Sequence, residues 1–157
     1  MFCVGDLVCY PMHGVGKVEA IEECSVLGET SRYYLLRFII GRMTAMVPVV
    51  SAEQVGLRAL ADRQTCEDVI RILSNDEYSE ESDNWNQRYR DNLDKLREGQ
   101  IRDVAGVVKC LMRRDKEKGL SAGERKMFLT ARQVLVAELS AATGRAESDL
   151  MELVGGV

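Results

Sequence analysis

The sequence predicts an α+β protein in which a small β module is followed by a compact helical bundle. Residues 1 to about 58 contain short runs of alternating apolar and polar residues, separated by glycine and proline, a pattern typical of strands. From about residue 62 the apolar residues recur at the three- and four-residue spacing of helices. A chain of 157 residues can bury a real core. We expect the boundary near residues 58–63.

The β module is predicted to contain four or five short strands, which suits a small meander or barrel. Strand-like runs cover residues 7–10, 15–22, 33–40 and 43–49. Pro48 places the last run at an edge of the sheet or at the end of its strand, because proline has no amide hydrogen to donate.

The helical part is predicted to contain four helices and a short fifth one. Residues 65–68 resemble a capping box for the first helix, and residues 121–124 form one for the fourth. Ser82 or Asp83 can cap the second helix, which Gly99 ends. Each helix has one apolar stripe, formed in chain order by Val69, Ile70 and Leu73; Leu93 and Leu96; Ile101, Val104, Ala105, Val108, Leu111 and Met112; Met127, Phe128, Ala131, Val134, Leu135 and Leu139; Leu150, Met151 and Val154.

Composition and cysteine pattern favour a cytoplasmic protein without a metal or another cofactor. No apolar stretch approaches the roughly 20 residues that span a bilayer, and the amino terminus has no basic region or cleavage pattern of a secretion signal. The five cysteines lie far apart and His13 is the only histidine, which disfavours zinc. We expect reduced, mostly buried cysteines. A catalytic pair of cysteine and His13 would lack an orienting partner, so we expect no enzyme.

Trp85 is the only tryptophan, and it lies among polar and charged residues. Such a ring suits contact with an outside molecule. Nucleic acid is the leading candidate, because bases stack on aromatic faces and arginine neutralises phosphate. The alternative is that Trp85 covers a core from its rim, as many tryptophans do. Local sequence leaves both interpretations open.

The net charge of −4 hides an asymmetry along the chain. Residues 62–83 include 8 acidic and 2 basic residues, and the acidic stretch 74–82 is predicted to be a loop. Residues 88–132 include 13 basic and 7 acidic residues. Because fields act within about a Debye length, the basic part can attract an anionic polymer. The acidic total predicts weak binding unless something else holds the protein in place.

Long motifs in both parts carry a family resemblance. In the first part they are residues 4–18, 33–38, 43–49 and 53–58; in the second they are Asn84-Trp85, Arg88-Tyr89, Leu93, Leu96, Arg113-Arg114-Asp115 and residues 119–124. The chain resembles the CarD/CdnL family over nearly its whole length. A module similar to the first part occurs in transcription-repair coupling factor, but the likeness of both parts argues against an isolated fragment of that protein.

The resemblance implies a specific role. Residues 1–60 would form a Tudor-like, SH3-like barrel that docks on the β subunit of bacterial RNA polymerase. Residues 61–157 would form the helical domain that touches promoter DNA. The family tryptophan, here Trp85, would wedge into the minor groove beside the −10 element and hinder collapse of the transcription bubble. The protein would act as a monomer that stabilises the open complex.

The expected docking strand lies at an exposed sheet edge, where a partner can add a strand. Within it Thr44, Met46 and Pro48 would share one face, and Met43, Ala45 and Val47 the other. Arg42 is the only basic residue nearby, so we expect an interface more apolar than ionic. The expected polymerase-binding residues are Arg42, Met43, Thr44, Ala45, Met46, Val47 and Pro48. The alternative is that this strand simply fills the barrel.

The expected DNA-binding residues are Trp85, Arg88, Arg90, Arg125 and Lys126. Arg88, three residues after the ring, is best placed to act beside it, while Arg90 reaches a neighbouring phosphate. Arg125 and Lys126 lie in the first turns of a helix, whose amide-rich end favours phosphate. A rival function is a protein–protein adaptor in which Trp85 anchors an interface with another protein.

Overall fold

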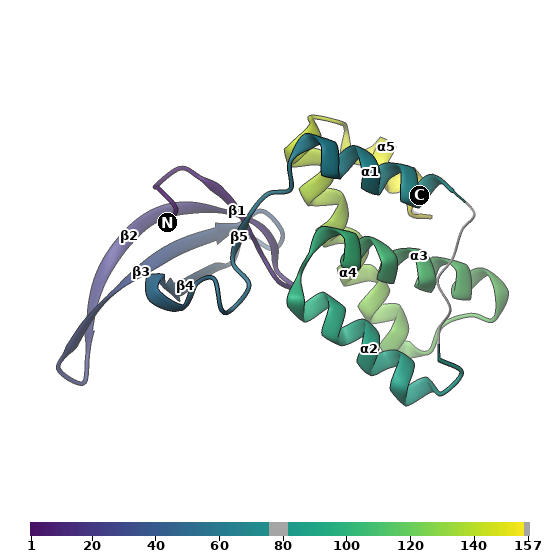
Figure 1. The fold of residues 1–157 in the computed structure, drawn as a ribbon, viewed down its shortest axis with the longest axis horizontal. Helices are drawn as coiled ribbons and strands as arrows, with labels where there is room; N and C mark the ends of the chain where they lie inside the picture. The colour runs from purple at the N-terminus through teal and green to yellow at the C-terminus, as the bar shows by residue number, and fades with distance from the viewer. Residues whose placement is uncertain (76–81, 156–157) are drawn as a thin grey trace.

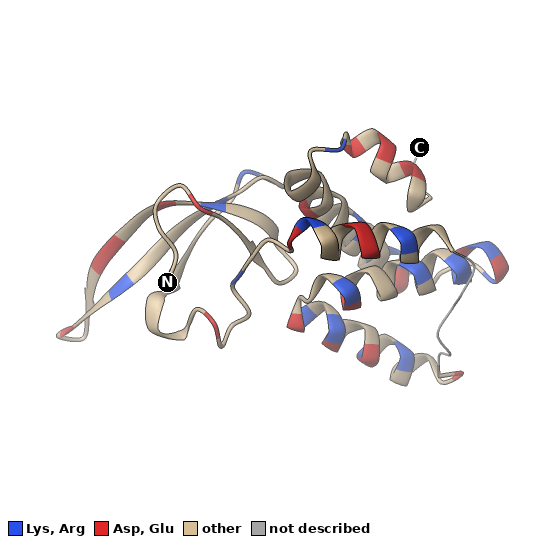
Figure 2. Ribbon diagram, turned by 45° about the horizontal axis from the view of Figure 1, so that its top comes forward, with Lys and Arg blue, Asp and Glu red and all other residues tan. Residues whose placement is uncertain are grey.

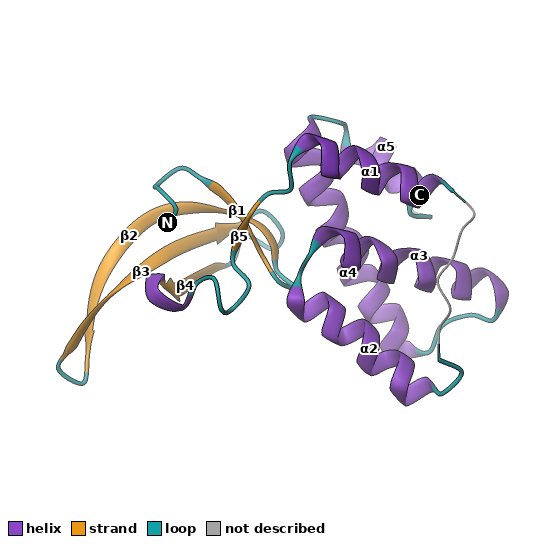
Figure 3. Cartoon of the chain, in the orientation of Figure 1, coloured by secondary structure: helices purple, strands orange, loops and turns teal. Residues whose placement is uncertain are grey.

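The computed structural model describes residues 1–75 and 82–155 and shows a β-sheet followed by a helical bundle (Figure 1, Figure 3). The strands are β1 (Leu7–Tyr10), β2 (Gly14–Val26), β3 (Glu29–Phe38), β4 (Thr44–Pro48) and β5 (Arg58–Ala59), with a 3-10 turn, η1 (Val49–Ser51), after β4. The helices are α1 (Arg63–Ser74), α2 (Trp85–Glu98), α3 (Ile101–Glu117), α4 (Ala122–Thr143) and α5 (Glu147–Leu153). The predicted order, strands first and helices second, is confirmed.

The sheet is antiparallel and has the strand order β4-β3-β2-β1-β5. The long hairpin of β2 and β3 closes through Leu27 and Gly28, whose φ angles are 53° and 81°. Two positive φ values are typical of the two-residue turn that matches strand twist. The hairpin extends away from the helices (Figure 1). Toward this turn both strands extend beyond the expected ranges 15–22 and 33–40, which the sequence did not reveal because the exposed outer half lacks a clear apolar alternation. At its other end β3 stops at Phe38, two residues earlier than expected.

One face of the sheet carries the core of the β module. The residues buried there come from four strands and the segment after β4: Val8, Val18, Tyr34, Leu36, Phe38, Val47, Ala52 and Leu57. Burial of apolar side chains on one face and polar side chains on the other fixes the register of each strand, since a one-residue slip would exchange the faces. β4 therefore has a defined inner and outer face.

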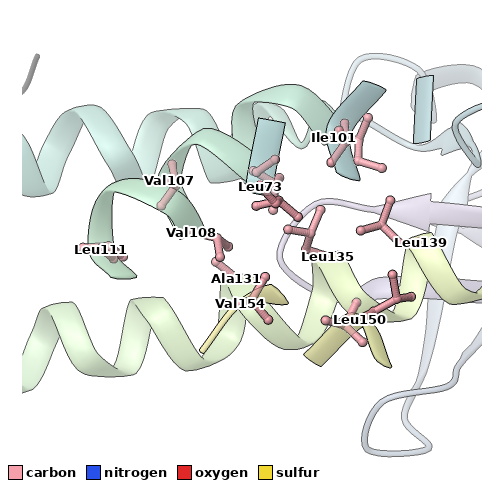
Figure 4. Close-up of a cluster of buried hydrophobic side chains, with 14 of the residues drawn as sticks. Leu73, Ile101, Val107, Val108, Leu111, Ala131, Leu135, Leu139, Leu150 and Val154 are labelled. Atoms are coloured by element: carbon pink, nitrogen blue, oxygen red, sulfur yellow. The ribbon is translucent and has the colours of Figure 1, made fainter. Parts of the chain in front are cut away.

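Helix α4 forms the centre of the bundle and contacts the other four helices. Figure 4 shows Leu73 of α1, Val108 of α3, Leu135 of α4 and Leu150 of α5 converging in one apolar cluster. All four side chains are at most 5% exposed. Burying a side chain of this size contributes roughly 1.5–3 kcal/mol, so the amphipathic stripes read from the sequence hold the helices together.

Two predicted helix boundaries are confirmed. Ser121 accepts a hydrogen bond from the backbone N–H of Glu124, and the Glu124 carboxylate accepts one from the backbone N–H of Ser121, which completes the capping box at the start of α4. Gly99 ends α2 with a left-handed φ of 76°, a conformation that glycine adopts without steric cost.

Two predicted N-caps were wrong by a few residues. Helix α1 is capped by Asp62, whose carboxylate accepts from the backbone N–H of Thr65, so Thr65 lies inside the first turn. Helix α2 is capped by Asn84, rather than by Ser82 or Asp83. The predicted loop at 74–82 lies mostly outside the described residues.

The cysteines are free thiols, and they differ in exposure. Cys9 and Cys66 are buried, Cys24 and Cys110 are partly buried, and Cys3 is exposed, so the expectation of mostly buried cysteines holds for only two of the five. In the described ranges no cluster of three or more histidine, cysteine or acidic residues could hold a metal ion. None of the helices described here is long and apolar enough to cross a membrane.

Candidate functional site

Trp85 is the first residue of α2 and lies at the end of that helix farthest from the sheet (Figure 1). The side chain of Asn84 caps the helix by accepting from the backbone N–H of Gln87, which fixes where the helix begins and therefore where the ring emerges. Trp85 is 43% exposed. It is neither sealed in the core nor free in solvent, so another molecule can reach it.

Contacts from two helices hold the Trp85 ring in one orientation. It stacks on Tyr89, one turn along α2, with ring centroids 5.2 Å apart and an interplanar angle of 16°. The indole N–H, on Nε1, donates to the Ser121 Oγ and to Glu124 Oε1, each at 3.3 Å. These contacts remove much of the rotational freedom of the ring before any partner arrives. A preorganised ring loses less entropy on binding than a mobile one.

Glu124 connects the ring to the interior of the bundle. It is 3% exposed, and its Oε2 accepts from Arg88 Nε at 3.2 Å and lies 3.7 Å from Arg114 Nε. Burial alone would raise the pKa of Glu124, but hydrogen bonds from Arg88 and Ser121 outweigh it and hold the pKa below its ordinary value. The carboxylate is therefore charged at neutral pH and accepts from the indole.

Arg88 differs from the sequence-based expectation. It was expected beside the ring and facing DNA, but it is 3% exposed and is directed inward. Its guanidinium donates to Glu124 through Nε and to the Ser82 carbonyl oxygen through Nη1, at 3.2 Å and 3.3 Å. Residues three apart do share a face of α2, but beyond the ring this face packs on α4, where the buried Glu124 carboxylate requires a cation.

The other three basic residues of the expected DNA site are exposed. Arg90 follows on α2, and Arg125 and Lys126 lie near the start of α4, the helix whose capping box holds the indole. Arg125 Nη2 forms an ion pair with Asp115 Oδ1 at 3.0 Å, and its side chain is still 53% exposed. Figure 2 shows more Lys and Arg bands on the helices than on the sheet. The structure thus places basic groups on both helices that meet at Trp85.

The expected docking strand is β4, and it is an edge of the sheet: within the described residues it pairs with β3 alone. Ala45 and Val47 are directed toward the core, whereas Thr44 and Met46 are exposed, so the predicted alternation of faces is confirmed for these four. Met43 precedes the strand and is 60% exposed. The alternative interpretation, that β4 simply fills the core of the β module, accounts for Ala45 and Val47. It does not account for the exposed side chains of Thr44 and Met46.

The two ends of β4 are well defined. Before the strand, Arg42 is exposed and has a left-handed φ of 52°. Such a φ is uncommon for a residue other than glycine. After it, Pro48 passes directly into η1. The edge is therefore a short segment bounded on both sides.

Three residues that hold the ring were not predicted as site residues: Tyr89, Ser121 and Glu124. Tyr89 carried a local signal, since residues four apart on a helix are neighbours. Ser121 and Glu124 were identified only as a helix cap. Their approach to Trp85 depends on the packing of α4 against α2, which no local pattern in the sequence encodes.

The depressed pKa of Glu124 gives the ring a predictable response to acid. The stability that the charged Glu124 carboxylate contributes to the fold is complete above the ordinary carboxyl pKa of about 4.3. It is lost as pH falls through the lower pKa that Glu124 has in the folded state. We expect the fluorescence of Trp85, the only tryptophan, to be constant from neutral pH to about pH 5 and to shift red only below about pH 4. In Glu124→Gln this acid transition should disappear. A wild-type transition centred above about pH 5 would contradict the assignment.

Comparison with known proteins now identifies the chain's family. The CarD-like/TRCF RID domain matches residues 2–61, and the CarD C-terminal domain matches residues 68–155. "Putative transcription factor YdeB" of Bacillus subtilis (strain 168) is 39% identical over 150 residues, which cover 96% of this chain and 97% of that protein. CdnLNt from Myxococcus xanthus is 38% identical, with a TM-score of 0.33, over 38% of this chain and 84% of that structure. The sheet is thus a Tudor-like domain of the RID type, and the chain belongs to the CarD/CdnL family of transcription factors.

Proposed function

We propose that this protein docks on the β subunit of RNA polymerase through β4 and stabilises the promoter open complex by wedging Trp85 into the minor groove at the upstream edge of the bubble. The observation that carries the proposal is the state of the Trp85 ring, which is 43% exposed and yet held by Tyr89, Ser121 and Glu124. An aromatic wedge needs both properties: access to the bases and a fixed direction.

The energetics suit a regulator that performs no covalent chemistry. Unstacking a base step costs a few kcal/mol, and an inserted apolar side chain offsets part of that cost. Stacking of a base on an aromatic side chain contributes roughly 1–3 kcal/mol. Because Trp85 is already oriented, little of this gain is lost in ordering the ring. A promoter with a marginal open state would respond to a change of this size.

Phosphate contacts would position the ring without reading sequence. Arg90 and Lys126 are exposed on the two helices that meet at Trp85, and Arg125 can exchange its surface pair with Asp115 for a phosphate. Arg88 serves this surface indirectly, since it neutralises Glu124. The net charge of −4 disfavours strong binding to free DNA. Tethering by polymerase would supply the high local concentration that a weak contact needs.

The β4 edge suits docking by strand addition, in which backbone hydrogen bonds supply affinity and outward side chains supply specificity. Met46 is 44% exposed on the outer face, with Thr44 beside it. Arg42 is the only basic residue between positions 39 and 49. The partner surface on the polymerase β subunit should therefore offer a free strand edge and apolar side chains. A monomer satisfies this arrangement.

Photo-crosslinking in a reconstituted polymerase–promoter complex tests both contacts. A crosslinking amino acid at Arg90 is expected to capture promoter DNA, and one at Met46 the β subunit. The matched control is Glu152, an exposed residue of α5, which should capture neither. Capture of protein alone from Arg90 would favour the adaptor function, and no capture of the β subunit from Met46 would refute docking through β4.

A further inference from the structure

The sheet and the bundle meet at a buried ion pair that the proposed function does not use. Arg58 of β5 donates through Nη1 to Glu138 Oε2 at 2.6 Å and through Nη2 to Glu138 Oε1 at 2.8 Å. Glu138 lies on α4, and the two side chains are 19% and 2% exposed. A two-pronged pair of this kind fixes direction as well as distance, because the guanidinium and the carboxylate are both planar.

Glu138 gathers further groups from the β module and the connecting segment. Its Oε2 also accepts from the backbone N–H of Ala61 at 2.9 Å, and its Oε1 accepts from the Cys9 thiol at 3.6 Å. Burial and the charge of Glu138 raise the pKa of Cys9 to about 12, so the thiol keeps its proton and donates it. One carboxylate on α4 therefore binds β1, β5 and the segment that enters α1.

Arg58 also binds the C-terminal end of α2, the helix that begins with Trp85. Its Nε and Nη2 donate to the carbonyl oxygen of Gly99 at 3.0 Å and 2.7 Å. Gly99 is the C-cap of α2. A helix C-terminus has unpaired carbonyl groups and partial negative charge, which an arginine satisfies. The sheet is thereby connected through one guanidinium to the C-terminal end of α2, the end opposite Trp85.

Close packing surrounds this pair. A Cβ added to Gly56 would come within 2.6 Å of Pro11, and one added to Gly99 within 2.9 Å of the same ring. Pro11 follows β1, and its ring packs between Gly56, which precedes β5, and Gly99 at the end of α2. Pro11 therefore packs closely against both halves, and the ion pair beside it supplies the directional hydrogen bonds that packing alone lacks.

We propose that Arg58 and Glu138 are positioning residues that set the direction of α2 relative to the docking sheet, so that Trp85 arrives at a fixed distance from the polymerase. This inference rests on the proposed function. The 14 residues of α2 make a lever of about 21 Å. A tilt of about 10° at Gly99 would move the ring by about 4 Å, which is enough to break stacking.

A double variant separates positioning from stability. In Arg58→Met/Glu138→Met both charges are replaced by apolar side chains of similar length, and such replacements of a buried pair are often neutral for stability. We expect unfolding near the wild-type temperature and an open-complex lifetime reduced about tenfold. Residual dipolar couplings should fit one alignment tensor in the wild type and require separate tensors for sheet and helices in the variant. The control, Arg145→Met/Glu67→Met, removes an exposed pair within the helical part and should match the wild type throughout.

The outcomes distinguish this inference from the function on which it rests. A single tensor and a normal lifetime in the double variant would overturn the positioning role, whatever Trp85 does. Separate tensors with a normal lifetime, in an assay where Trp85→Ala shortens it, would overturn that role as well. Separate tensors together with a normal lifetime for Trp85→Ala would support the joint and refute the wedge.

Discussion

Replacing Trp85 with alanine is expected to shorten the lifetime of the promoter open complex by about tenfold while leaving polymerase binding intact. Loss of one stacked base contact removes roughly 1–3 kcal/mol, and each 1.36 kcal/mol corresponds to about a factor of ten. The polymerase contact should persist, because β4 lies in the other part of the chain. The measurement is dissociation of preformed open complexes after challenge with competitor, at saturating protein.

A control truncation elsewhere on the surface tests whether the shorter open-complex lifetime is specific to the Trp85 ring. Leu129 is 46% exposed on α4 and is not among the residues named above that hold the Trp85 ring, so Leu129→Ala should leave the lifetime unchanged. Trp85→Phe keeps a stacking surface but loses the N–H donor to Ser121 and Glu124, and it should fall between the wild type and alanine. A normal lifetime with Trp85→Ala would refute the wedge.

Replacing Arg88 with methionine is expected to destabilise the helical bundle by about 3 kcal/mol, since removing one partner of a buried pair leaves an uncompensated charge. Glu124 would stay buried, with Arg114 at 3.7 Å as partial compensation. For a protein of this size, the change corresponds to a fall in Tm of roughly 6–12 °C. Thermal unfolding followed by circular dichroism measures it.

Two further variants test whether the loss of stability in Arg88→Met comes from its buried ion pair with Glu124. Arg90→Met removes an exposed arginine from the same helix and should alter stability by less than about 0.5 kcal/mol. Arg88→Met/Glu124→Gln removes both charges and should recover much of the lost stability. If Arg88→Met proved as stable as Arg90→Met, the inward ion pair would not hold the bundle.

Features encoded over short stretches of sequence were predictable. The change from alternating to helical spacing predicted strands followed by helices, and Pro48 placed β4 at an edge. The cap of α1 shows the limit of such patterns: residues 65–68 match a capping box, but Asp62 lies three residues before Thr65 and accepts its amide hydrogen. Both residue types suit an N-cap, so the local pattern alone does not decide between the two positions.

The site was predictable only where it depends on one helix. Trp85 and Arg90 were placed correctly on the surface, whereas the inward direction of Arg88 depends on Glu124, which lies 36 residues away. The joint between Arg58 and Glu138 joins residues 80 apart. Hydrogen bonds of this kind follow from how the elements pack, and neither residue type nor spacing reveals the partner.

The brevity of β4 has a consequence for self-association. An unpaired edge can recruit a second copy of the same chain and grow into aggregates. Here the open backbone is five residues long, about 17 Å, and it ends abruptly at Pro48, with the left-handed Arg42 just before it. A strand from a second copy has few registers in which it can pair with β4. Pro48 and Arg42 limit the extension of that pairing at the two ends of the strand. The edge of β4 can therefore stay accessible to a partner while offering little length for the addition of further copies.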